Sequence, residues 1–444
     1  MCRTRARGCN SVSRDTGGTL AMTAKRGRRR EKPIRVGVVG VGRGQSFASG
    51  ATELTGMKLA ALCDTWEERL REVARRYRVA AYTDYNRFLE HDMDAVVLAN
   101  YFHQHAPFAI RALEAGKHVM SETSCNSTLA EGVALCRAVE KSGRIYMLAE
   151  NYPYTRFHME MKRLYDNGEI GDVTYAEGEY NHPMSPRDRL AISPGMNHWR
   201  NWIPPTYYCT HALAPLVYIT GRMPVRVNAL SIACRELDRQ TVRRGDPGCV
   251  ILCRMDNGAV FRLFGLILPG HSNWTRVHGT KGAMEITRGP GYFGPGLVRV
   301  WHEPWDCPRG APTERTYVPE WPHHAHLAER AGHGGGDFWT NFEFANAIRT
   351  GRQPFLNVYR GVAMSSVGIL AWKSALRDGA PFEMPDFSKE FSRRAVENDN
   401  WSPFPEHAGQ DQPAPSVLGF VEPSAGGVRL AKRVWKSVGY KGGV

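Results

Sequence analysis

The sequence predicts an α/β protein with two domains, in which a parallel sheet wound with helices precedes an open, mainly antiparallel sheet. Two observations predict the first domain, over residues 33–152: a glycine cluster directly after an apolar strand, and regular alternation of strand-like and helix-like segments. One observation predicts the second, an α+β domain over residues 153–385: strand-like runs follow one another with few helices between them. We expect residues 1–32 to form a disordered basic arm and residues 386–444 to form an irregular tail.

The chain's glycine cluster lies at residues 34–44, with the sequence IRVGVVGVGRG. Its β-branched residues predict a buried strand that turns sharply at Gly40, Gly42 and Gly44 into a helix. Glycine allows positive φ angles in such a turn, and the missing side chain lets backbone N–H groups approach a pyrophosphate. The place usual for a third glycine holds Gln45, and Gly44 comes one residue early. This slightly weakens the argument for close packing of helix on strand and leaves the dinucleotide prediction intact.

A carboxylate follows the second apolar run. Residues 57–63 read MKLAALC and end at Asp64, 24 residues after Gly40. A carboxylate at this point can accept both ribose hydroxyls of an adenosine and repels a 2′-phosphate, which predicts NAD as the cofactor. Arg69, about one helical turn later, could tolerate the 2′-phosphate of NADP, so the preference for NAD over NADP rests on Asp64. The alternative is a βαβ unit with an acidic loop and no cofactor.

The first domain should contain five strands and several crossover helices, in the order that a parallel sheet requires. We predict strands at 36–40, 59–63, 95–99, 118–121 and 145–149, and helices at 45–54, 67–76, 107–115 and 129–142. Ligands of such sheets bind at the carboxyl ends of the strands. The candidate positions are therefore Asp64 and residues 100–105, 122–126 and 150–154.

The second domain begins after a connecting helix at 157–167. We predict strands at 173–180, 224–234, 250–255, 259–268 and 283–287, and helices at 206–219, 337–349 and 357–377. Asn257-Gly258 between two strand-like runs is a hairpin signal. The Gly/Pro/His-rich residues 288–336 indicate long loops, and Gly334 to Gly336 indicate a close approach of two backbone segments.

Composition excludes several other classes of protein. The net charge of +14 comes almost entirely from residues 1–32 and from the segment after Glu422, so the body is nearly neutral and nucleic-acid binding is not expected. The ten cysteines show no Cys-x-x-Cys pair, which favours free thiols in a reducing compartment. With no secretion signal and no membrane segment evident, we expect a cytoplasmic protein. His323, His324 and His326 have no carboxylate or cysteine arranged with them, so we predict no metal site.

Two motifs carry a resemblance to a known family. Residues 94–105 (DAVVLANYFHQH) and 112–122 (ALEAGKHVMSE) follow the glycine loop in the order found in the Gfo/Idh/MocA oxidoreductases, which the sequence resembles. The resemblance implies an N-terminal Rossmann domain and a C-terminal open-sheet domain. It also implies hydride transfer between bound NAD and a sugar or related polyol, in a homo-oligomer built through the open sheet.

The sequence departs from that family at two motifs. The lysine of the family's Glu-Lys-Pro motif, which helps to move the substrate's hydroxyl proton, is replaced by Thr123 after Glu122. The family's Asp-x-x-x-His helix motif begins here with Tyr207 and keeps only His211. Three other segments, 179–182, 208–215 and 333–337, resemble the branch of NAD-dependent α-N-acetylgalactosaminidases. That branch implies an alternative function, a glycosidase acting by transient oxidation, elimination, hydration and re-reduction.

The candidate site residues follow from these motifs. We expect His211 to act as the base, because imidazole has a pKa near the working pH. Tyr208 or Tyr207 should lie on the same face of the helix as His211. Glu122 should orient a hydroxyl of the cofactor ribose or of the substrate. Packing inside the core is the alternative for each of them. A NAD-binding sensor without chemistry is a third hypothesis. The remaining candidates are Gly40, Gly42, Arg43, Gly44, Asp64, Asn100, His105, Glu122 and Asn151 for the cofactor, and Tyr180, His182, Trp199, Arg200, Tyr207 and His333 for a carbohydrate substrate.

Overall fold

The computed structural model describes residues 32–52, 54–233, 240–307, 309–407 and 412–442. Residues from Pro33 onward form one compact unit. The predicted disordered arm lies outside the described residues except for Lys32. Among the described helices, none is long and apolar enough to cross a membrane.

The first sheet has six parallel strands in the order β3-β2-β1-β4-β5-β6. The five predicted strands are confirmed, and a short sixth strand, β3, adds to the edge. The carboxyl ends of β1, β2, β4, β5 and β6 therefore meet at one edge of the sheet, as the site prediction requires. The strands are β1 (Ile34–Val39), β2 (Met57–Cys63), β3 (Ala80–Tyr82), β4 (Ala95–Leu98), β5 (His118–Ser121) and β6 (Tyr146–Leu148).

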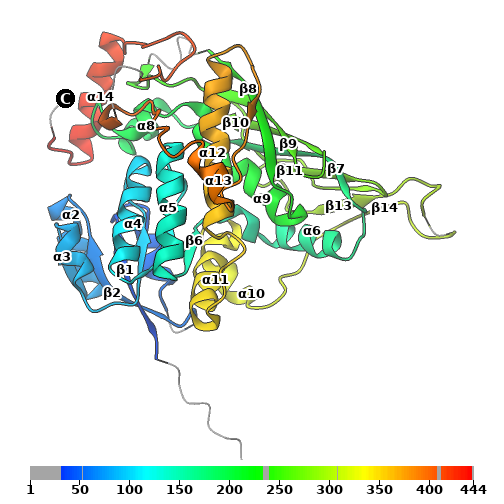
Figure 1. Cartoon of the computed structure of the whole chain (residues 1–444), viewed down its shortest axis with the longest axis horizontal. Helices are drawn as coiled ribbons and strands as arrows, with labels where there is room; N and C mark the ends of the chain where they lie inside the picture. Colours follow the sequence, from blue (N-terminus) through cyan, green and yellow to red (C-terminus); the bar gives the residue numbers. More distant parts are fainter. Residues whose placement is uncertain (1–31, 53, 234–239, 308, 408–411, 443–444) are drawn as a thin grey trace, which may run out of the picture. The chain divides into compact units, whose positions relative to one another are not determined.

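The helices of this domain begin and end close to their predicted positions. Thr128 and Glu131 form a reciprocal capping box at the start of α5, and Gly143 ends that helix in the left-handed conformation at φ +62°. Helices α4 and α5 pack side by side (Figure 1). The helices are α1 (Gly44–Gly50), α2 (Glu67–Tyr77), α3 (Tyr85–Leu89), α4 (His105–Glu114) and α5 (Leu129–Ser142), with a 3₁₀ turn at Phe102–Gln104.

The second sheet has nine strands in the order β14-β13-β12-β11-β7-β10-β9-β8-β15. All neighbouring strands are antiparallel except β7 and β10. The predicted mainly antiparallel sheet and the hairpin at Asn257-Gly258 are confirmed. The strands are β7 (Val173–Asn181), β8 (Pro224–Ile232), β9 (Gly248–Met255), β10 (Val260–Leu266), β11 (Ser272–Gly279), β12 (Ala283–Ile286), β13 (Val298–Trp301), β14 (Glu314–Tyr317) and β15 (Phe382–Glu383).

Helices join this sheet to the first domain. Helix α12 is buried along most of its length and contacts both β8 and α5 (Figure 1). Helix α9 packs on β7 and α6. The helices are α6 (Arg156–Asp166), α7 (Pro186–Ala191), α8 (Trp199–Trp202), α9 (Thr210–Thr220), α10 (Ala325–Ala328), α11 (Gly336–Thr350), α12 (Val358–Ala375), α13 (Glu390–Arg394) and α14 (Ala425–Ser437), with 3₁₀ turns at Tyr152–Tyr154, Pro205–Tyr208, His333–Gly335 and Pro405–His407.

The prediction of loops throughout residues 288–336 is wrong for β13, β14 and α10. In β13 the apolar side chains Val298 and Val300 are buried while Arg299 and Trp301 alternate with them on the other face. This alternation is the normal strand pattern. Its four residues are too few to stand out among the glycines and prolines on either side.

The prediction of an irregular tail over residues 386–444 is wrong for α13 and α14. Helix α14 buries Ala431, Val434 and Trp435 against Leu190 of α7, and the Trp435 indole N–H donates to the Leu190 carbonyl at 3.0 Å. The apolar stripe has helical spacing. The basic residues on its exposed face made the segment resemble a solvated charged tail.

Replacing Trp435 by alanine is expected to destabilise the packing of α14 on α7 by about 3 kcal/mol, because a buried indole is lost together with its hydrogen bond. Thermal unfolding followed by circular dichroism measures the effect. Trp305→Ala is the matched control, since Trp305 is 79% exposed. A Trp435 variant as stable as the Trp305 variant would contradict docking of α14.

Candidate active site

The glycine loop joins β1 to α1 with the geometry of a dinucleotide-binding turn. Gly40 has φ +94°, and a Cβ there would lie 2.3 Å from the Ala99 carbonyl oxygen. A Cβ at Gly42 would meet nothing within 4 Å, so space for a ligand lies beside that residue. A Cβ at Gly44 would lie 2.8 Å from Cγ1 of Val38. Gly44 therefore allows the close approach of α1 to β1 despite coming one residue early.

Asp64 lies beside this loop at the carboxyl end of β2. Its Oδ2 accepts the Val41 backbone N–H at 2.7 Å, and its Oδ1 accepts the Trp66 N–H at 2.8 Å. The guanidinium of Arg69 stacks over the Trp66 ring at 5.6 Å. The carboxylate is thus fixed next to the phosphate-binding turn, in the place where a ribose would meet it.

Several buried polar atoms near the carboxyl ends of the strands have no hydrogen-bond partner among the residues that the structure describes. They are Oδ1 of Asn100, Oγ1 of Thr123 and Oδ1 of Asn151, each from a different strand end. Buried polar atoms are rarely left without hydrogen bonds unless a ligand or water supplies them. Together with the open space at Gly42 and the fixed Asp64, these atoms fit a bound dinucleotide.

His105 lies behind these residues, at the start of α4. Its Nδ1–H donates to the Ser124 carbonyl at 2.9 Å, while its Nε2 is buried and has no partner among the described residues. Burial lowers the pKa of this imidazole, although the Ser124 hydrogen bond partly opposes the shift. The ring is therefore neutral at physiological pH and holds the segment after β5 in place.

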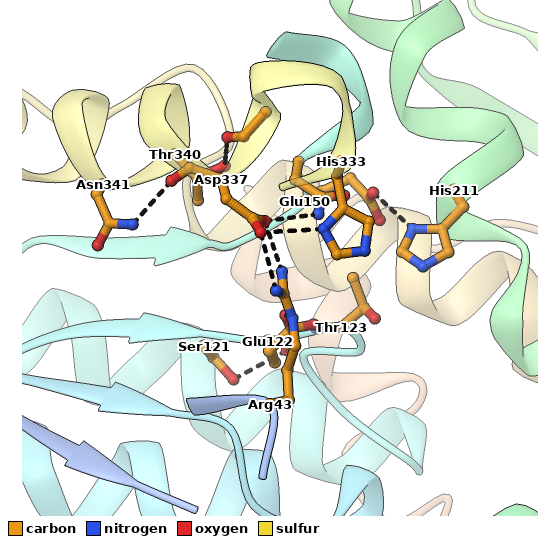
Figure 2. Close-up of polar contacts among 12 residues, drawn as sticks. Arg43, Ser121, Glu122, Thr123, Glu150, His211, His333, Asp337, Thr340 and Asn341 are labelled. Carbon is orange, nitrogen blue, oxygen red and sulfur yellow. Dashed lines mark hydrogen bonds and ion pairs between the residues drawn. The ribbon is translucent and has the colours of Figure 1, made fainter. Parts of the chain in front are cut away.

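Arg43 connects the glycine loop with the second domain (Figure 2). Its Nε donates to Glu122 Oε1 at 2.6 Å, and its two terminal nitrogens donate to the Asp337 carboxylate at 2.8 and 3.1 Å. Burial alone would lower the pKa of the guanidinium, but the two carboxylates outweigh it and raise the pKa. Because the side chain is already engaged by two carboxylates, Arg43 contacts a cofactor best through its backbone.

Asp337 is the centre of the contacts made at the start of α11. Besides Arg43, its carboxylate accepts from Asn151 Nδ2 at 3.0 Å and from His333 Nδ1 at 3.0 Å. Burial alone would raise the pKa of this carboxyl, but the hydrogen bonds from His333 and Arg43 lower it below its usual range. The predicted backbone approach is confirmed, since a Cβ at Gly336 would lie 2.3 Å from the Asn151 carbonyl oxygen.

His211 and Glu150 form a buried pair. Nδ1 of His211, near the start of α9, lies 2.6 Å from Oε1 of Glu150, just after β6 (Figure 2). Glu150 is fully buried, and its second oxygen has no hydrogen-bond partner in the described part of the chain. A carboxylate only accepts, so Nδ1 carries the proton and Nε2 is left as an acceptor. The sequence placed Glu150 at a strand end without giving it a role, and only the fold brings it to His211.

Aromatic rings surround His211. Its ring centroid lies 4.5 Å from Tyr152, 4.5 Å from Tyr180 and 4.9 Å from Tyr208. Burial raises the pKa of each of these phenols, so they remain protonated donors. The Tyr152 and Tyr292 hydroxyls share a hydrogen bond, and burial raises the pKa of Tyr292 to about 12. Tyr152 lies in the predicted strand-end segment 150–154, although the sequence analysis assigned it no role. Tyr292 was not predicted to belong to the site, because it lies in a loop that carries no motif.

The other predicted substrate residues divide into two groups. His182 contacts the rings of Tyr180 and Tyr292, so it belongs to the group of aromatic rings around His211. Burial lowers the pKa of His182. Trp199 stacks on Phe102 and is 7% exposed, with the Arg200 guanidinium over its ring at 4.2 Å. Trp199 also lies nearly parallel to the Tyr208 ring, with the two centroids 6.4 Å apart, so it packs against one of the tyrosines that contact His211.

The structure does not bring Tyr207 to the site. Tyr207 is 1% exposed and its ring packs against Phe102 and Phe404, and no described residue makes a hydrogen bond with its hydroxyl. The sequence argument assumed one continuous helix from Tyr207 to His211. Tyr207 instead lies in a 3₁₀ turn that ends before α9 begins, so the two side chains do not share a helix face.

No metal centre is evident in the part of the chain that the structure describes: no three His, Cys, Asp or Glu side chains gather as ligands there. His323 and His324 are exposed and lie against the rings of Trp339 and Phe342.

Comparison with known proteins gives family matches over most of the described chain. Residues 34–150 match the family described as "Oxidoreductase family, NAD-binding Rossmann fold", and residues 158–285 match the "GFO/IDH/MocA C-terminal domain". Residues 244–392 also match the "Glycosyl hydrolase 109, C-terminal domain". The family match agrees with the fold and with the glycine loop. Together, these observations define an NAD-binding protein of the oxidoreductase class. The chain belongs to the Gfo/Idh/MocA oxidoreductase family, on a branch shared with glycosyl hydrolase family 109.

Individual relatives agree with this assignment. A glycosyl hydrolase family 109 protein of Solibacter usitatus (strain Ellin6076) is 26% identical over 394 residues, covering 80% of this chain and 88% of the relative. One from Saccharopolyspora erythraea is 25% identical over 432 residues, covering 86% and 87%. Among solved structures, the fold resembles a levoglucosan dehydrogenase in complex with NADH and L-sorbose (TM-score 0.67, 22% identity, 80% of this chain and all of that chain). It also resembles the aldose-aldose oxidoreductase of Caulobacter crescentus (TM-score 0.62, 20% identity, 79% and all).

Proposed function

We propose that this protein oxidises a hydroxyl group of a sugar or sugar-derived substrate with NAD, using His211 as the base. The observation that carries the proposal is the buried His211–Glu150 pair, which lies among hydrogen-bonding phenols and joins the strand end of the NAD domain to a helix of the second domain. A sugar offers several hydroxyls to such donors. The names of the relatives and structural neighbours, which concern sugars and glycosides, support the same substrate class.

The chain's own residues can perform the proton transfer. Nε2 of His211 takes the proton of the substrate hydroxyl, and Glu150, bound to Nδ1–H, stabilises the imidazolium that forms. The glycine loop and Asp64 would hold NAD, which would supply the hydride acceptor for this oxidation. Tyr180 and Tyr208 orient the substrate hydroxyl as hydrogen-bond donors. Glu122 and Thr123 follow β5, at the carboxyl ends of the strands where the cofactor would bind. The family lysine that Thr123 replaces is therefore not required, because the imidazole–carboxylate pair supplies the base.

A second candidate function is a glycoside hydrolase in which the same oxidation is transient. The match of residues 244–392 to a glycosyl hydrolase 109 domain favours it. Oxidation next to a C–H bond acidifies that bond, so the glycosidic oxygen leaves by elimination. Water then adds, and the hydride returns to the sugar. The net reaction consumes water and leaves the cofactor unchanged.

Incubation with nitrophenyl glycosides and with free sugars tests both candidates. Nitrophenol release and absorbance of reduced nicotinamide are followed together. NADH that accumulates on free sugars without nitrophenol establishes the dehydrogenase. Nitrophenol release without net NADH establishes the hydrolase. Bound NAD with neither product on any sugar would contradict both and support a sensor.

The enzyme's setting is part of the proposal. We place it in the cytoplasm, because the seven cysteines among the described residues are free thiols and six of them are buried. We also propose a homo-oligomer formed through the second sheet. Its outer face exposes Leu230 and Leu252 on neighbouring strands, at 59% and 38%.

A further inference from the structure

The segment that follows α14 returns to the NAD domain. Helix α14 packs on α7 of the second domain, and the chain then reaches the beginning of α2. A Cβ at Gly439 would lie 3.9 Å from the Trp66 ring, and Lys441 Nζ makes an ion pair with a Glu68 carboxylate oxygen at 2.5 Å. Residues 439–441, the C-terminal strap, therefore lie against the loop that follows β2.

The C-terminal strap is also fixed to the second domain. A Cβ at Gly195, between α7 and α8, would lie 2.6 Å from the Tyr440 hydroxyl oxygen. The Tyr440 ring faces Trp435 of α14, with the two centroids 6.1 Å apart, and Trp435 is 2% exposed. A buried anchor thus holds one end of the strap while the other end contacts α2. The strap therefore connects the two domains.

The adenosine half of a dinucleotide would lie beside this strap. Strand β1 lies between β2 and β4, so the loops that follow β2 and β4 flank the glycine loop. Asp64 belongs to the first of these loops and Tyr101 to the second. Partial burial raises the pKa of Tyr101, and the nearby Tyr440 and Asp64 raise it further. A dinucleotide with its pyrophosphate on the glycine loop and a ribose on Asp64 directs its adenosine toward these residues.

We propose that the C-terminal strap covers the adenosine end of bound NAD and slows its release. The side chains of Lys441 and Glu68 are 76% and 68% exposed, so their ion pair contributes little. The cover comes instead from the backbone against Trp66 and from the packing of Tyr440, and NAD leaves when these contacts open. The inference rests on NAD binding alone and does not depend on the proposed reaction.

The strap also lies outside the matched domains. The family matches described above end at residue 392, and the strap begins 47 residues later, at Gly439. A slow release of NAD through this strap would therefore be a property of this chain's own C-terminal segment. The glycine loop and Asp64, which the NAD-binding family match includes, would still bind the cofactor without it.

The test removes the strap by ending the chain at Val438, which keeps α14 and its packing on α7. Release of radiolabelled NAD from the loaded protein is followed after addition of excess unlabelled NAD. We expect release to be about tenfold faster, or more, than from the full chain. Tyr440→Ala should accelerate release by a smaller factor. Lys441→Ala should change it less than about twofold.

Phe420→Ala is the matched control for the Tyr440 variant, because Phe420 lies in the same C-terminal part of the chain and is 54% exposed. It should release NAD at the rate of the full chain. Nicotinamide mononucleotide, which lacks the adenosine, distinguishes a cover from a general loosening. Its affinity, measured by calorimetry, should be the same with and without the strap. An unchanged rate of NAD release in the shortened chain would overturn the inference. Equal weakening of both ligands would overturn it as well.

Discussion

Replacing His211 by alanine is expected to lower turnover by about 10³-fold while NAD stays bound, because the variant loses the base but keeps the whole glycine loop. Glu150→Gln should lower turnover by about 10²-fold, since the amide keeps the shape of the side chain but does not stabilise an imidazolium. Steady-state kinetics on the substrate found in the screen measures both losses. The cofactor content of the purified variants is measured by absorbance and mass analysis.

The control for this pair is another imidazole–carboxylate pair of the chain. His302 Nε2 lies 3.0 Å from Glu169 Oε1, between β13 and the end of α6. His302→Ala should leave turnover within about twofold of wild type, since surface substitutions away from a site have small effects. A His211→Ala variant that keeps more than a tenth of wild-type activity would contradict the proposal that His211 is the base.

Replacing Arg43 by methionine is expected to destabilise the protein by about 3 kcal/mol, because two largely buried carboxylates lose their common cation. The side chains of Glu122 and Asp337 are 13% and 8% exposed, so water relieves little of their repulsion. The variant should also lose NAD more readily, since Arg43 begins the helix after the glycine loop. Thermal unfolding and cofactor content measure the two effects.

Arg71→Met is the control for this loss of charge. Arg71 pairs with Glu67 on the exposed face of α2, where both side chains are more than half exposed. Such pairs contribute at most about 1 kcal/mol. Adding Asp337→Asn to Arg43→Met should restore part of the stability, because one of the two uncompensated charges is removed. Equal melting temperatures for the Arg43 and Arg71 variants would contradict the buried cluster.

The strands of the first domain were predictable because each has a local signal. A parallel strand buried on both faces appears as an apolar run of a few residues, and the glycines and helix caps mark where it ends. In the second domain the signal is weaker. Strand β11 carries the buried polar residues Asn273 and Thr275, and β14 is too short to show alternation. Strand β11 also depends on pairing with β7, which is distant in sequence and which a local pattern does not contain.

The sequence by itself determined the dinucleotide fold, the NAD preference through Asp64, and His211 as the candidate base, because each depends on residue types at short spacings. Only the tertiary structure decided that Glu150 is the partner of His211, that Arg43 joins Glu122 to Asp337, and that Tyr207 stays in the core. Those contacts join residues 61 to 294 positions apart or reverse a helix-face argument at a 3₁₀ turn. The pairing of Arg43 with Glu122 depends on how the strands of one sheet are ordered, and the other two contacts form only where the two domains meet, so no local pattern encodes them.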